Sequence, residues 1–89
     1  MQRRVVHFSG HVQGVGFHFH VRSIAAQLPV KGFVRNLEDG RVELVVEGDA
    51  SSIDALIGRV HEQMNGYIDD THERIESPIG EFTGFEIRR

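Results

Sequence analysis

Two stretches of the chain repeat apolar residues at helical spacing, and each stretch has apolar residues on one side only. The first stripe is formed by Val21, Ile24, Ala25 and Leu28, and the second by Ile53, Leu56, Ile57, Val60 and Met64. Pro29 and Gly32 predict the end of the first helix, and Asp49 with the serines after it are candidate caps of the second. A helix with one apolar side must bury that side against another layer of structure. The remaining segments are the candidates for that layer.

Several of these segments have the patterns of β-strands. A β-branched run at 5–8 predicts a strand that ends near Ser9. Strand-like runs at 32–37 and 41–48 flank Asp39-Gly40, and Asp-Gly between such runs is a strong hairpin signal. In the second run the buried face is marked by Val42, Leu44 and Val46, with Glu43 and Glu47 facing away. These patterns predict a hairpin with one apolar face.

The last third of the chain is less regular. Residues 67–76 are polar and weakly patterned, whereas Phe85 and Ile87 alternate with charged neighbours near the end. The resulting order is βαββαβ. Two helices that each bury one stripe against a mostly antiparallel sheet predict an α+β, ferredoxin-like two-layer sandwich with both helices on one face.

Composition limits the class of protein. At 89 residues the chain has room for one domain, so we expect residues 1–89 to form a single domain. Thirteen acidic against ten basic side chains give a net charge of −3, which disfavours a nucleic-acid partner. There is no cysteine, which excludes disulfides and thiolate zinc sites. Because no segment has the length of a signal-peptide core or a membrane span, we expect a cytoplasmic protein without a membrane partner.

A glycine-containing stretch lies between the first strand and the first helix. It comprises Gly10, His11, Val12, Gln13, Gly14, Val15, Gly16 and Phe17. Gly14 and Gly16 allow positive φ, so several N–H groups can point inward beside the positive end of the helix dipole. The stretch therefore predicts a cradle for an anion such as phosphate or sulfate. The alternative is a tight turn in which the glycines only relieve backbone strain.

The same stretch resembles the acylphosphatase signature G-x-V-Q-G-V-x-F-R, and Gly32-Phe33-Val34-Arg35-Asn36 resembles the second motif of that family, G-x-V-x-N. The similarity covers nearly the whole chain. It implies hydrolysis of the carboxyl-phosphate bond of small acyl phosphates without a metal or other cofactor. In that family the loop amides and an arginine hold the phosphate, while an asparagine positions the attacking water. The resemblance thus assigns anion binding to residues 11–18 and water positioning to Asn36.

The resemblance breaks at one position, since His18 stands where the signature has arginine. An imidazole offers one N–H toward a ligand, whereas a guanidinium is a planar multiple donor. We therefore expect an acylphosphatase-like hydrolase that is slowed by His18. The alternative is an anion-binding or interaction module that has lost hydrolysis. A module of a larger carbamoyl-transfer protein is a third, remoter option.

Three further points concern the surroundings of this position. Arg22 follows His18 by one helical turn and can either reach back toward the cradle or remain an ordinary exposed arginine.

His11, His18 and His20 lack the spacing of a metal site, so no metal is expected. Charged residues are distributed over the strand-like segments in the manner of protected sheet edges, which predicts a monomer.

Overall fold

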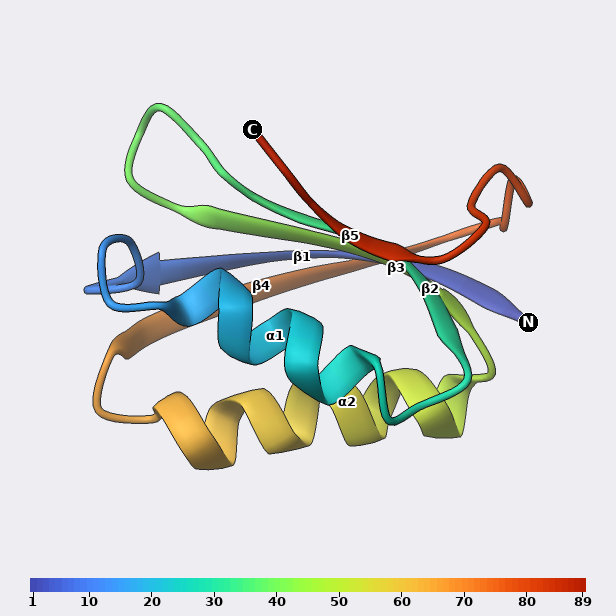
Figure 1. Ribbon diagram of the computed structural model, residues 1–89, viewed down its shortest axis with the longest axis horizontal. Coiled ribbons are helices and arrows are strands. Elements are labelled where there is room, and N and C mark those ends of the chain that lie inside the picture. The colour runs from blue at the N-terminus through green and yellow to red at the C-terminus, as the bar shows by residue number, and fades with distance from the viewer.

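Both helices lie on one face of a single five-stranded sheet (Figure 1). The computed structural model describes residues 1–89. The elements in chain order are β1 (Gln2–Gly10), α1 (Phe17–Ala25), β2 (Val30–Asn36), β3 (Val42–Gly48), α2 (Ala50–Met64), β4 (Ile68–Glu76) and β5 (Phe85–Arg88).

The strand order in the sheet is β4-β1-β3-β2-β5. Every neighbouring pair is antiparallel except β2 and β5, which run parallel. The first six elements form the βαββαβ unit, and β5 adds an edge strand beside β2. The predicted α+β, ferredoxin-like sandwich with a mostly antiparallel sheet is confirmed.

The main core lies between the sheet and the helices. Its largest fully buried side chains include Phe8 and Leu44 from the sheet and Phe17, Ile53 and Leu56 from the helices. Full burial of side chains of this size contributes about 1.5 to 3 kcal/mol each. Both predicted apolar stripes face this core. Only Leu28 falls outside its helix, since α1 ends at Ala25 and a turn of i to i+3 hydrogen bonds leads to Pro29.

The opposite face of the sheet has an apolar centre of its own, which the sequence patterns did not predict. Val5, Phe33 and Val45 form a second cluster with Phe82, which comes from the connection between β4 and β5. Residues 77–84, which connect β4 to β5, are called the 77–84 segment below. The segment crosses this face of the sheet, so the face is partly covered although no helix lies on it.

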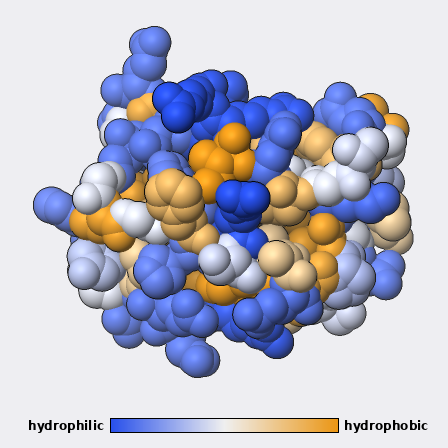
Figure 2. All heavy atoms as spheres, viewed as in Figure 1, coloured by the Kyte–Doolittle hydropathy of each residue, from blue (hydrophilic) through white to orange (hydrophobic).

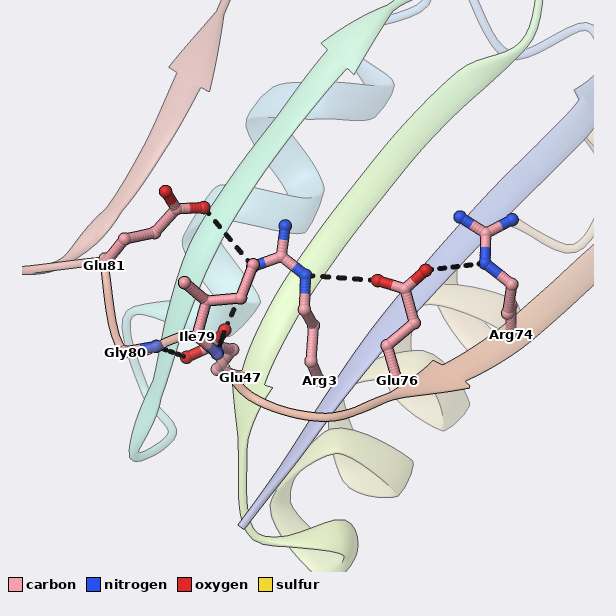
Figure 3. A network of polar contacts seen from close by, with 7 residues as sticks. All are labelled: Arg3, Glu47, Arg74, Glu76, Ile79, Gly80 and Glu81. Atoms are coloured by element: carbon pink, nitrogen blue, oxygen red, sulfur yellow. Dashed lines mark hydrogen bonds and ion pairs between the residues drawn. The ribbon is translucent and has the colours of Figure 1, made fainter.

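Glu47 holds the 77–84 segment in place (Figure 3). Its carboxylate accepts hydrogen bonds from the backbone N–H groups of Ile79 at 2.8 Å and Gly80 at 3.0 Å, and from Arg3 at 3.0 Å. Glu47 faces away from the helices, as predicted, but it is buried rather than exposed. Burial alone raises the pKa of this carboxyl. The donors outweigh that effect, so its pKa lies below the ordinary value.

Two smaller observations concern the helices and the surface. Asp49 occupies the N-cap position of α2, but its side chain makes no capping hydrogen bond. Neither helix is long and apolar enough to cross a membrane. Figure 2 shows hydrophilic residues over much of the face in view, with apolar residues gathered in separate patches between them.

Candidate functional site

The loop between β1 and α1 turns through two left-handed glycines. Gly14 has φ of 77° and Gly16 has φ of 75°, a region that residues with a Cβ rarely adopt. Gly16 is also the N-cap residue of α1, and no side chain caps this end of the helix. The first turn of α1 therefore begins with its N–H groups uncapped.

Backbone donors accumulate along this loop. None of the N–H groups of residues 12–19 donates a hydrogen bond to an acceptor within the protein. Such groups normally find a partner in the protein, in water or in a ligand. The N–H of His11 differs from them, because it donates to the carbonyl oxygen of Tyr67 at 2.8 Å. The N–H groups without an acceptor in the protein therefore begin at Val12.

The side chain of Gln13 connects the loop to the β2–β3 hairpin. Its Nε2 donates to the carbonyl oxygens of Leu37, at 2.8 Å, and Arg41, at 2.9 Å. The sequence suggested a part for Gln13 in the cradle, but not this contact. Because Leu37 follows Asn36, the hydrogen bonds place the loop beside the end of β2.

A hollow of about 550 Å³ opens at this end of the molecule. It is lined by His18, Phe19, Arg22, Asn36, Ile87, Arg88 and Arg89. The structure thus brings together the two side chains singled out in the sequence, His18 and Asn36. Residues 11–17 do not line the hollow and lie just before it along the chain.

His18 is half-buried at the start of α1. Its ring lies edge-on to that of Phe19, with the centroids 4.6 Å apart, and its Nδ1 atom is buried without a hydrogen-bond partner. An imidazole in this position offers a ligand one N–H, whereas a guanidinium offers several.

The lining of the hollow is cationic, although the whole chain is acidic. Three arginines line it and no Asp or Glu does. Arg88 is held elsewhere, because its Nε lies 2.6 Å from Glu86 Oε1 and its guanidinium stacks over Phe33 at 4.1 Å. No salt bridge joins Arg22 or Arg89 to a carboxylate. An anion that enters the hollow thus meets no acidic lining residue.

Arg35, the neighbour of Asn36, is fixed on the other face of the sheet. Its Nε lies 2.8 Å from Glu43, which also contacts His7 at 2.8 Å. Burial raises the pKa of the Glu43 carboxyl, but His7 and Arg35 outweigh it and keep the pKa below its ordinary value. Asn36 itself is exposed at the last position of β2.

Part of the hollow could not be found by sequence reasoning. Ile87, Arg88 and Arg89 reach it because β5 runs parallel to β2, with Val34 opposite Ile87 and Arg35 opposite Arg88. No local pattern in the sequence indicates that β5 pairs with β2. No group of three or more His, Cys, Asp or Glu side chains lies close enough together to hold a metal ion.

The chain is similar to known proteins in sequence and in structure. The family model described as Acylphosphatase matches residues 4–87. An acylphosphatase from Thermobifida fusca is 45% identical over 80 residues, which are 89% of this chain and 88% of that protein. The crystal structure of acylphosphatase from Bacillus subtilis superposes with a TM-score of 0.89 and 28% identity over the full length of both chains. HypF from T. kodakarensis gives a TM-score of 0.85 and 32% identity, with all of this chain on 12% of that one.

Proposed function

Because this chain belongs to the acylphosphatase family, we propose that it hydrolyses the carboxyl-phosphate bond of small acyl phosphates, with the phosphate bound by the amides of residues 12–18 and the water positioned by Asn36. The observation that carries the proposal is the shared hollow. His18 and Asn36 line it together, directly beside a loop whose backbone donors have no acceptor in the protein.

The reaction asks little of the protein beyond positioning. The oxygen of water attacks phosphorus, the bond from phosphorus to the acyl oxygen breaks, and carboxylate and inorganic phosphate leave. A carboxylic acid has a pKa of about 4, so it departs as an anion at neutral pH without being protonated. The step therefore depends mainly on alignment of the water and on stabilisation of charge across the phosphate oxygens.

The chain's own groups supply these two contributions. A carboxamide can accept a hydrogen bond from water and donate one to a phosphate oxygen at the same time, and Asn36 is exposed at the rim where both can approach. Amides at a helix N-terminus favour anions through direct hydrogen bonds and through the helix dipole. Inorganic phosphate, the product, is expected to bind as a competitive inhibitor.

His18 sets the expected rate. We propose that it occupies the position of the family's arginine and replaces a planar multiple donor by one N–H. The loss of one well-placed donor to a transition state typically costs 10²- to 10³-fold in rate, and this is the upper limit of the slowing that we expect.

The test is hydrolysis of a simple aryl acyl phosphate, with spontaneous hydrolysis subtracted. We expect measurable turnover by the native chain, a loss of about 10²- to 10³-fold in Asn36→Ala, and a gain of at most that size in His18→Arg. Turnover that Asn36→Ala leaves unchanged would contradict the assigned role of Asn36. No native turnover, with activity appearing in His18→Arg, would instead favour the non-catalytic anion-binding module.

A further inference from the structure

We propose that Arg22 binds the phosphate group in the hollow, as the guanidinium that position 18 lacks. The inference rests on the proposed function. Its starting point is that Arg22 lines the same hollow as His18 and Asn36. Three properties of Arg22 favour this role: its direction on the helix, its lack of a carboxylate partner and the form of its donor group.

The direction follows from helix geometry. Arg22 comes four residues after His18 on α1, so the two side chains share one face of the helix. The Cα–Cβ bonds of a helix tilt toward its N-terminus, and long side chains cover the turn before their own. One turn is about 5.4 Å. Helix geometry therefore favours an Arg22 side chain that extends toward His18 and the uncapped N–H groups of the first turn.

Arg22 is also the arginine of the hollow that is both free and fixed at its backbone. Arg88 is engaged by Glu86 and Phe33. Arg89 has no carboxylate partner but lies beyond the end of β5. Arg22 has no carboxylate partner, and its carbonyl oxygen accepts the N–H of Ala26 at 3.0 Å within the last turn of α1. A fixed backbone lowers the cost of ordering the side chain on a ligand.

The donor group fits the ligand. A guanidinium presents a planar fork that binds two phosphate oxygens at once and stays charged at all ordinary pH values. His18 supplies one N–H donor at the same helix end. Arg22 therefore supplies the positive charge and the double hydrogen bond that neither His18 nor the loop amides supply.

The first test uses inorganic phosphate as the probe, titrated into the full chain at low ionic strength and followed by NMR shifts of the amides of residues 12–19. We expect Arg22→Gln to bind phosphate about 10- to 100-fold more weakly than the native chain. The matched control is Arg59→Gln, which removes an exposed helix arginine whose only side-chain hydrogen bond goes to Gln27 at 3.5 Å. It should change the affinity less than twofold. Equal affinities of the two variants would overturn the proposal.

A second measurement separates Arg22 from the enzyme proposal. In the aryl acyl phosphate assay, Arg22→Gln should lower kcat/KM by about 10- to 100-fold, with Arg22→Lys intermediate. Adding His18→Arg to Arg22→Gln should restore activity by more than it adds to the native chain, because both guanidinium groups serve one phosphate. Additive effects would contradict a shared ligand. If no variant hydrolyses the substrate, the proposed function fails, and the phosphate titration still decides the role of Arg22.

Discussion

The side chain of Gln13 illustrates, at the scale of a single residue, how a loop is held beside a site that it does not line. Both of its hydrogen bonds go to backbone carbonyl oxygens of the β2–β3 hairpin. The loop, the start of α1 and the end of β2 are thereby fixed relative to one another. Gln13 is a positioning residue, and its contribution can be measured as stability.

Gln13→Ala removes both donors and should lower the free energy of unfolding by about 1 to 2 kcal/mol. Gln13→Glu keeps the shape but directs a carboxylate at two carbonyl oxygens, so it should cost more, about 2 to 3 kcal/mol. Urea denaturation followed by circular dichroism measures both. A Gln13→Glu variant as stable as the native chain would show that these hydrogen bonds contribute nothing.

Single residues also show what the sequence could reveal about the site. His18 and Asn36 were found because each stands in a short motif, and the structure places both in one hollow. The available donors at residues 12–19 follow from the glycines and the uncapped helix end. The hydrogen bond from the His11 N–H to the carbonyl oxygen of Tyr67 could not be predicted, because the two residues lie far apart in the sequence.

At the scale of elements, the 77–84 segment depends on a buried carboxylate. Glu47 accepts from two consecutive backbone N–H groups and from Arg3, and the segment in turn places Phe82 over the sheet (Figure 3). The acceptor, rather than a regular element, defines the path of the chain between β4 and β5.

Glu47→Gln should lower the free energy of unfolding by about 1 to 3 kcal/mol at neutral pH, because it removes the charge that three donors share. Glu81→Gln is the matched control. Glu81 also faces Arg3, at 3.4 Å, but it is exposed, and its loss should stay within about 0.5 kcal/mol. Equal effects in the two variants would contradict the role of the buried carboxylate.

Acid should weaken the fold through the same group. The pKa of Glu47 is lower in the folded than in the unfolded chain, so the unfolded chain binds its proton first as pH falls. The stabilisation is therefore complete above the ordinary range of a carboxyl group, about pH 4 to 5, and is lost below it. Glu43 acts in the same direction. Unfolding curves measured between pH 7 and pH 3 should show a smaller decrease in Glu47→Gln than in the native chain.

The elements differ in how well the sequence predicted them. Both helices and the hairpin have one buried face, and the spacing of apolar residues shows it. The strand β4 spans Ile68–Glu76 and is mostly exposed on both faces, since it lies at the edge of the sheet. Its position depends on hydrogen bonds to β1, which leave no hydrophobic period in the sequence. The path of the 77–84 segment was missed for a similar reason, because Phe82 is an isolated aromatic residue.

At the scale of the whole molecule, both edges of the sheet are protected by charge. The exposed edge strand β4 has Asp69, Asp70, Glu73 and Arg74 around the exposed Ile75. The other edge, β5, has four residues, of which Glu86 and Arg88 are charged and exposed. Short or charged edges disfavour pairing with a second copy.

We therefore expect a monomer at all practical concentrations. Light scattering coupled to size exclusion should give a constant mass close to 10.1 kDa between 10 µM and about 1 mM, the range in which weak edge pairing would become visible. A mass that rises toward twice this value as the protein concentration is raised would show that the charged edges do not prevent association.

The parallel pairing of β5 with β2 also determines the stage of protein synthesis at which the hollow can form. Residues 87–89 form one wall of the hollow, while His18 and Asn36 belong to the first half of the chain. The ribosome synthesises the first half of the chain before it synthesises β5. The growing chain therefore contains His18 and Asn36 before it contains β5, and the hollow is complete only once β5 pairs with β2.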